Sequence, residues 1–262
     1  MENFVDKLTH GDCLEVMPHI PDHSVDMVLC DLPYEVTARN KWDIMIPFEP
    51  LWKEYLRVTK DNAAIVLTAT LPFAATAIMS KPELFRYDLV WGKNKSTGFL
   101  NAKRMPLRAH ELILVFYQKC PVYHPQKTTG HKPVNSFTKH TSDGTNYGVT
   151  KRGLRGGGQT DRYPNSVINF SVVNNDAKDK AHPTQKPVEL FEYLIKTYTD
   201  KGMVVLDNAI GSGTTAIASI NLHRHWIGIE KSVGYYRKAL ARITAHREEI
   251  SERLFQIPQA AG

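Results

Sequence analysis

The sequence predicts an α/β fold in which a mostly parallel sheet carries helices on both faces. Short apolar runs typical of buried strands alternate along the chain with segments whose apolar residues recur at helical spacing. Such alternation is typical of βαβ units, whose parallel strands are covered from both sides. The length of 262 residues suits one large domain, or one domain with a substantial insertion.

The N-terminal part of the chain alternates strand-like runs with a helical segment. Leu51, Tyr55 and Val58 recur at helical spacing, which predicts a helix over 50–60. The apolar runs around this helix have the length and composition of buried strands. They predict strands at 24–30, 62–70, 87–94 and 111–119.

The C-terminal part continues the same alternation. Apolar residues share one helical face over 186–199, where Pro187 stands suitably near the start, and again in a long segment that begins near 232. Between these helices the pattern predicts strands at 203–207 and 226–230 and a helix at 214–223.

The middle of the chain has a different texture. Residues 120–178 are rich in Gly, Asn, Ser, Thr, Lys and Pro and have few apolar runs. A segment of this length is too long for an idle connection and is usually functional or disordered. We therefore predict that 1–119 and 179–262 form one α/β domain, and that 120–178 is inserted into it.

Composition limits the class of protein. The formal charge of +6 permits a polyanionic partner. Cys13, Cys30 and Cys120 form no metal-type pairs, so we expect reduced thiols and no metal site. The polar N-terminus does not resemble a signal peptide, and no apolar run approaches the ~20 residues of a membrane span. These features predict a cytoplasmic protein.

A glycine-rich turn stands out in VVLDNAIGSGTTAIA (204–218), where a strand ends in Asp207 and a helix follows Gly213. The loop lacks the Lys of a phosphate-binding Walker loop and the third glycine of a dinucleotide fingerprint. Glu230 ends the next strand, a position from which an acid typically binds ribose hydroxyls. The set predicts a site for a nucleoside-type cofactor, whereas the glycines alone would fit a plain turn with helix-capping threonines.

Several motifs together resemble the amino-group DNA methyltransferases. DNAIGSGTT resembles the S-adenosylmethionine loop of that family, and DLPY (31–34) its catalytic D-P-P-Y tetrapeptide. The tetrapeptide comes first, the variable segment second and the cofactor loop last, which is the circularly permuted order of the β subgroup. GDCLEVM, NKWD, LVWGKN, RAHELILVFYQK and AHPTQKPVEL add further matches. The chain departs from the pattern at Leu32, where the family prefers proline, and at Asn208 and Ala209, which replace Pro-Phe.

The resemblance implies a Rossmann-like methyltransferase that transfers a methyl group from S-adenosylmethionine to the N6 amine of adenine in double-stranded DNA, after the base is flipped out. Asp31 would accept one N–H of the amine, and the carbonyl of Pro33 or Leu32 the other. Tyr34 would offer its ring for the base to stack upon. We expect Leu32 to shape the loop and leave the reaction unchanged.

The resemblance also implies cofactor contacts. Gly211 and Gly213 would lie near the amino-acid portion of S-adenosylmethionine, Glu230 at the ribose and Asp12 near the adenine amine. Asp12 could also be a helix N-cap, with Glu15 completing a capping box. The predicted cofactor residues are Asp12, Thr184, Lys186, Asp207, Gly211, Ser212, Gly213, Thr214, Thr215 and Glu230, of which Thr184 and Lys186 are candidates for the methionine carboxylate.

In the family the inserted segment reads the DNA sequence, and basic side chains suit that role. Lys151, Arg152 and Arg155 are our candidates for DNA contact, although any one of them could lie on a solvated loop. We expect residues 35–48 to be mobile without DNA and to close over the flipped base. A homodimer and a cognate restriction endonuclease are further expectations.

Three other functions stay open. The amine of cytosine N4 resembles that of adenine N6; Asp31 favours adenine, because the cytosine enzymes more often carry Ser there. A non-catalytic DNA-binding protein with the same fold would not need Asp31, Tyr34, Asp207 and Glu230 together. A nucleotide-dependent oxidoreductase would be expected to have the third glycine.

Overall fold

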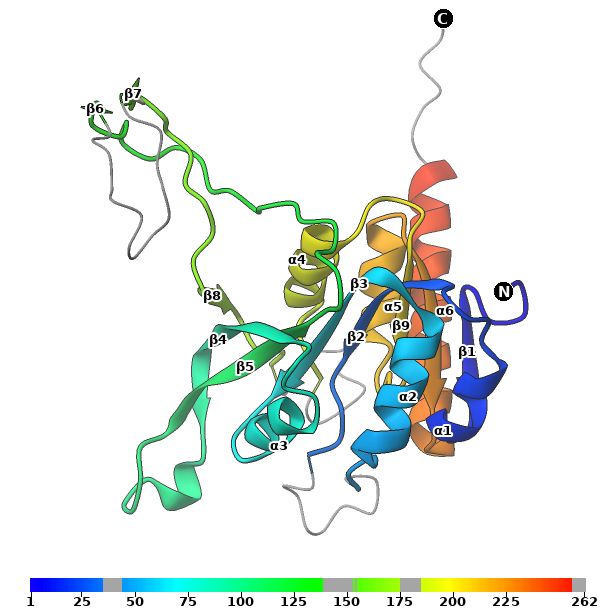
Figure 1. Cartoon of the computed structure of the whole chain (residues 1–262). Coiled ribbons are helices and arrows are strands. Elements are labelled where there is room, and N and C mark those ends of the chain that lie inside the picture. Colours follow the sequence, from blue (N-terminus) through cyan, green and yellow to red (C-terminus); the bar gives the residue numbers. More distant parts are fainter. Residues whose placement is uncertain (35–43, 139–152, 154, 175–184, 256–262) are drawn as a thin grey trace, which may run out of the picture. The chain divides into compact units, whose positions relative to one another are not determined.

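The computed structural model describes residues 1–34, 44–138, 153, 155–174 and 185–255 (Figure 1). The predictions made for Thr184, Lys151, Arg152 and most of 35–48 lie outside the described residues. Contacts divide the chain into two compact units, one made of Met1–His124 and Ser166–Gly262 and the other of Pro125–Asn165. The predicted limits of the insertion, 120 and 178, stay a prediction about function.

The larger unit is built on an eight-stranded sheet of order β1-β10-β9-β2-β3-β5-β4-β8. Every neighbouring pair is parallel except the two that β5 makes with β3 and β4. This confirms the mostly parallel α/β sheet. The strands are β1 (Lys7–His10), β2 (Val25–Cys30), β3 (Thr59–Ala69), β4 (Phe85–Thr97), β5 (Arg108–Phe116), β8 (Val167–Phe170), β9 (Val204–Asp207) and β10 (His225–Glu230).

Helices cover both faces of the sheet, as predicted. Strand β2 shows how one strand serves both faces: Val28 and Cys30 pack in one cluster, and Met27 and Leu29 in the other. The first cluster includes residues of α1, α2 and α3, and the second residues of α4 and α5. The helices are α1 (Cys13–Val16), α2 (Phe48–Val58), α3 (Phe73–Ser80), α4 (Val188–Tyr198), α5 (Thr214–Asn221) and α6 (Val233–Phe255), with short 3₁₀ turns η1 (Met17–His19) and η2 (Phe99–Asn101).

The parallel strands bring several acids together at the carboxyl-terminal ends of adjacent strands. Asp31 directly follows β2, Asp207 ends β9 and Glu230 ends β10. These strands are adjacent, with Val28 opposite Leu206 and Gly228 opposite Asp207. Ligands of open α/β sheets bind at the carboxyl ends of the strands. The topology therefore places the predicted tetrapeptide and the predicted cofactor loop side by side.

The smaller unit contains a two-stranded ladder, β6 (Phe137–Thr138) with β7 (Arg155–Gly156). Lys127 pairs with Asp161 at 2.8 Å, and the Arg162 guanidinium donates to the carbonyl of Lys132 at 2.5 Å. These two basic residues therefore support the unit itself. Among the described helices of the whole chain, none has the length and apolar character to span a membrane.

Candidate active site

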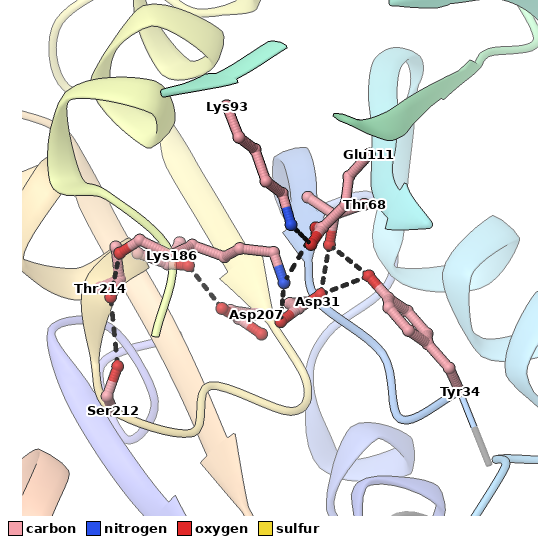
Figure 2. Close-up of polar contacts among 10 residues, drawn as sticks. Asp31, Tyr34, Thr68, Lys93, Glu111, Lys186, Asp207, Ser212 and Thr214 are labelled. Atoms are coloured by element: carbon pink, nitrogen blue, oxygen red, sulfur yellow. Dashed lines mark hydrogen bonds and ion pairs between the residues drawn. The ribbon is translucent and has the colours of Figure 1, made fainter. Parts of the chain in front are cut away.

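Asp31 is the centre of a hydrogen-bond network at the end of β2 (Figure 2). Its Oδ1 accepts hydrogen bonds from the hydroxyls of Tyr34 and Thr68, which also contact each other at 2.8 Å. Its Oδ2 accepts a hydrogen bond from Lys186 Nζ at 2.5 Å. A carboxylate held in this way by three side chains is fixed in orientation, which a simple turn-forming aspartate would not need.

Lys186 connects Asp31 to a second, partly buried acid. Only 7% of its side chain is exposed, and its Nζ lies 3.5 Å from Glu111 Oε2. Burial by itself lowers the pKa of Lys186, but Asp31 and Glu111 outweigh that effect and the net pKa is raised. Buried charges are tolerated when they are paired. Lys186 is therefore a cation held between two carboxylates.

Lys93 completes the chain of alternating charges. Its Nζ donates to Glu111 Oε1, and it lies 5.0 Å from the ring centroid of Trp91. The side chains of Lys93 and Glu111 come from the facing strands β4 and β5, near the end of the sheet where Asp31 lies (Figure 2). The order Lys93–Glu111–Lys186–Asp31 balances two positive and two negative charges within this cluster of described residues.

Tyr34 is held against the network by its ring as well as its hydroxyl. Its ring centroid lies 4.7 Å from that of Phe73, at an interplanar angle of 35°. Burial, and then the neighbouring Asp31 carboxylate, raise the pKa of the Tyr34 phenol well above its usual value. The hydroxyl is therefore a donor at any working pH.

Leu32 is buried in the core cluster that also contains Phe73, and only 3% of it is exposed. An apolar side chain at this position fills the core below the loop, which explains why the chain tolerates leucine where the family prefers proline. The effect of Leu32 on the reaction stays a prediction.

Asp207 and the glycine loop form the second part of the site. Burial raises the pKa of Asp207 to about 7, although hydrogen bonds from the Thr215 hydroxyl, the Cys30 thiol and the Ala209 N–H oppose the shift. The loop then turns through Gly213, which caps α5 with φ 82°. A Cβ on Gly213 would lie 3.0 Å from Ile243 Cδ1 of α6. The positive φ favours glycine here, and an added Cβ would be in tight contact with Ile243.

Glu230 ties the glycine loop to the end of β10. Its Oε2 accepts from the Gly211 N–H at 2.9 Å and its Oε1 from the Ser232 N–H at 2.8 Å. Burial raises the pKa of Glu230, although these backbone donors partly offset the shift. The carboxylate is therefore oriented by the backbone, with further lone pairs available to a ligand.

Asp12 has one of the two roles that the sequence left open for its side chain. It is the N-cap of α1, with Oδ1 accepting from the Leu14 N–H at 2.9 Å. Its Oδ2 accepts from Lys231 Nζ at 2.8 Å. Partial burial raises the pKa of Asp12, but these two hydrogen bonds outweigh it and the net pKa is lowered. The cap is thus observed, and a contact with the cofactor stays a prediction.

The loop that contains Lys186 contacts the glycine loop, although the two are distant in the sequence. Thr214 Oγ1 donates to the carbonyl of Lys186 at 3.4 Å and contacts the Ser212 hydroxyl at 3.2 Å (Figure 2). Arg242 of α6 donates to the carbonyl of Ser212 at 3.0 Å. The loop that precedes α4 is therefore joined to the glycine loop that precedes α5.

The larger unit brings together most of the residues predicted from sequence. Arg155 lies in the smaller unit, on β7, and its contact with DNA stays a prediction. Sequence reasoning assigned no role to Thr68, Lys93, Glu111 or Arg242. The signal for two of them was present, since Lys93 directly follows the apolar run LVWG and Glu111 directly precedes the run LILVF.

These features define a class of protein. A permuted α/β sheet that carries an acidic tetrapeptide after β2 and a glycine loop between two acid-ended strands is the fold of an S-adenosylmethionine-dependent methyltransferase. A model of the N6/N4 DNA methylase family matches residues 25–241. The chain belongs to this family of amino-group DNA methyltransferases.

Comparison with individual proteins agrees with that family. The chain is 26% identical over 253 residues to the type II methyltransferase M1.MboII of Moraxella bovis, covering 90% of this chain and 95% of the relative. It is 26% identical to the type II methyltransferase M.BglII of Bacillus subtilis, covering 94% and 71%.

Two solved structures have a similar fold. M1.HpyAVI in complex with SAM superposes with a TM-score of 0.61 at 23% identity, covering 90% of this chain and 98% of that one. The cytosine-N4-specific PvuII DNA methyltransferase superposes with a TM-score of 0.66 at 15% identity, covering 94% and 92%.

Proposed function

We propose that the chain transfers the methyl group of S-adenosylmethionine to the N6 amine of adenine in double-stranded DNA, after the base is flipped out of the helix. The observation that carries this proposal is the Asp31 carboxylate, which Lys186, Tyr34 and Thr68 hold at the edge of the sheet beside the glycine loop. An acceptor in that place suits an amine that must lose its planarity and its proton.

The chemistry asks the protein for alignment and for hydrogen-bond acceptors. S-adenosylmethionine, when bound, supplies an electrophilic methyl group on a sulfonium. The exocyclic amine is a weak nucleophile, because its lone pair is delocalised into the ring. Asp31 accepts one amine N–H and the carbonyl of Leu32 or Pro33 accepts the other. Both acceptors bind more strongly as positive charge develops on the nitrogen, so they stabilise the transition state more than the ground state.

The residues around the glycine loop fit a nucleoside-type cofactor. The loop approaches through Gly211 and Gly213, and Glu230 at the end of the adjacent strand is positioned for hydroxyl groups. No lysine follows Gly213 to neutralise a phosphate. We therefore assign this half of the site to S-adenosylmethionine.

Lys186 receives a different role from the one that the sequence suggested. Its ammonium already contacts Asp31 and Glu111, two carboxylates of this chain. We propose that it orients the catalytic carboxylate through this ion pair, and that binding of the methionine carboxylate depends on the loop backbone. The transition state benefits because an acceptor fixed in advance needs no reorganisation during methyl transfer.

Cytosine N4 is the second candidate, because the PvuII enzyme with the same fold is specific for it. The deciding experiment incubates the protein with mixed-sequence duplex DNA and methyl-labelled S-adenosylmethionine, digests the DNA and identifies the labelled nucleoside. We expect N6-methyladenine. Label on cytosine N4 would replace adenine as the target, and the absence of label from DNA would overturn both assignments.

A homodimer and a partner restriction endonuclease remain proposals. The two relatives described above carry the designation type II methyltransferase. Sedimentation velocity of the purified protein tests the first proposal. Protection of methylated DNA from cleavage by a candidate endonuclease tests the second.

A further inference from the structure

A long hairpin extends from the sheet beside the active site. Strand β5 is antiparallel to β3 and β4, so β4 runs in the same direction as β2. Asp88 of β4 is level with Cys30 of β2, through Leu114 and Leu67 of the strands between them. Strand β4 continues to Thr97, about 25–30 Å further at ~3.3 Å per residue. Residues 94–109, here called the finger, therefore project from the same end of the sheet as Asp31, beyond the carboxyl-terminal end of β2 (Figure 1).

The tip of the finger carries large apolar side chains in the open. Phe99 is 69% exposed, Leu100 102% and Met105 58%. Phe99 and Leu100 lie in the 3₁₀ turn η2, which Gly98 enters with φ 94°, and Met105 follows it. A projecting apolar tip of this kind contributes nothing to the core, and such patches usually mark an interaction site.

The same tip is strongly basic. No acidic residue occurs between Asp88 and Glu111, whereas the finger itself carries Lys95, Lys103, Arg104 and Arg108. Within the described part of the chain, the side chains of Lys103, Arg104 and Arg108 make no hydrogen bond or ion pair. Their charge is therefore available to an external polyanion.

We propose that the finger is a second DNA-contacting element, separate from the 120–178 segment. Its cations bind backbone phosphates, and Phe99, Leu100 and Met105 form an apolar wedge against the base stack. Proteins that deform DNA combine these same two features, cationic contacts and apolar wedges. The wedge would lower the work of extruding the target base beside Asp31.

DNA fits this surface better than a second copy of the chain does. In a twofold dimer whose axis passes through the two tips, the unneutralised cations of one finger would face those of the other. DNA supplies the opposite charge and is the substrate of the family. The proposal rests on duplex DNA as substrate and does not depend on which base is methylated.

The first experiment measures the salt dependence of duplex binding by fluorescence anisotropy. Lys103→Ala/Arg104→Ala should make the slope of log affinity against log salt shallower by about 1.8, since each phosphate contact contributes about 0.9. Lys196→Ala/Lys201→Ala is the matched control, because Lys196 lies in the last turn of α4 and Lys201 just before β9, at the opposite end of that strand from Asp207. The control should leave the slope unchanged. Equal slopes for the two double variants would overturn the proposal.

The second experiment tests the wedge. Phe99→Ala/Leu100→Ala should keep the salt slope but slow single-turnover methyl transfer at least 10-fold on a paired target site, once that site is mapped. The rate should recover when the target base lies opposite an abasic position, because a base that is already unpaired needs no extrusion. Equal slowing on both duplexes, or no slowing, would refute the wedge.

Sedimentation velocity tests whether a second copy of the chain, instead of DNA, binds the tip of the finger. Conversion of a wild-type dimer to monomer by Phe99→Ala/Leu100→Ala would assign the tip to contact between chains and overturn the DNA proposal. The binding assay needs no methyl transfer, so its result stands apart from the identity of the methylated base. Label on cytosine would remove the adenine assignment and leave the finger untouched.

Discussion

Replacing Lys186 with methionine is the sharpest test of the active-site network. The substitution keeps the length of the side chain and removes the cation that lies 2.5 Å from Asp31 and 3.5 Å from Glu111. Lys93 then remains as the one described cation beside two carboxylates, and the cluster gains a net negative charge. The prediction is a loss of stability together with a selective loss of methyl transfer.

The distances set the size of the effect. At an effective dielectric constant near 20, the attractions at 2.5 and 3.5 Å are about 7 and about 5 kcal/mol before the desolvation of Lys186 is subtracted. Removing one partner of a buried pair costs about 3–5 kcal/mol, mostly because the remaining charge is left uncompensated. We therefore expect Lys186→Met to lower the free energy of unfolding by about 3–5 kcal/mol.

A double-mutant cycle assigns that loss to charge. Glu111→Gln in the Lys186→Met background removes one negative charge and restores neutrality, so the double variant should be more stable than the sum of the two single losses by about 1–3 kcal/mol. Urea unfolding at a fixed pH measures each variant. Lys201→Met, at an exposed position, is the control and should change stability by less than about 0.5 kcal/mol.

Kinetics separate orientation of Asp31 from binding of the cofactor. If Lys186 orients the carboxylate, kcat falls at least 100-fold while the Kd for S-adenosylmethionine, measured by calorimetry, changes less than about 3-fold. A 10-fold rise in Kd with unchanged kcat would restore the role suggested by the sequence and refute our reasoning. Additive stabilities in the cycle would equally refute the charge network.

Three further predictions follow from the same site. Asp31→Ala should abolish methyl transfer while S-adenosylmethionine still binds; simultaneous loss of both in the assays above would mean that Asp31 is mainly structural. Burial raises the pKa of Asp207 to about 7 from 3.8, so the folded state holds this proton more tightly, and the stabilisation present below pH 3.8 is lost as pH rises to about 7. The free energy of unfolding, measured with urea between pH 4 and 7, should therefore fall less steeply with pH in Asp207→Asn, by about 1.4 kcal/mol per pH unit. An unchanged pH dependence would contradict this prediction. Gly213→Ala should lower the free energy of unfolding by about 1–3 kcal/mol, because alanine disfavours φ 82° and its Cβ meets Ile243. Ile243→Val should recover only the strain from Cδ1, because valine keeps a carbon at the Cγ1 position 3.1 Å from the added Cβ, and a neutral Gly213→Ala would contradict the assignment.

Most of the regular elements could be predicted from the sequence. The predicted strand at 24–30 corresponds to β2, and the predicted helix at 186–199 to α4. Both are long enough for their apolar periodicity to be read locally. The short strands β1 and β8 were not predicted, because four residues carry too little periodic pattern, and of α1 only the N-cap at Asp12 was anticipated. Helix α3 was also missed.

The direction of β5 also required the structure. Its apolar run predicted a buried strand, but an apolar run is the same in a parallel and an antiparallel neighbour. The antiparallel pairing with β4 creates the finger, whose exposed tip is a property of tertiary structure. The sequence showed its basic and apolar residues without showing that they are exposed.

What the sequence by itself determined are the groups whose chemistry is local: the carboxylate of Asp31 in its rigid tetrapeptide, the glycine loop, and the acid at the end of the following strand. What only the tertiary structure decided is the partner of each charge. Lys186 and Asp31 are 155 positions apart, and their pairing depends on two loops that meet at one edge of the sheet. The physical reason is that a buried charge must be compensated by whatever group the fold brings within a few ångströms, and local sequence carries no record of that distance.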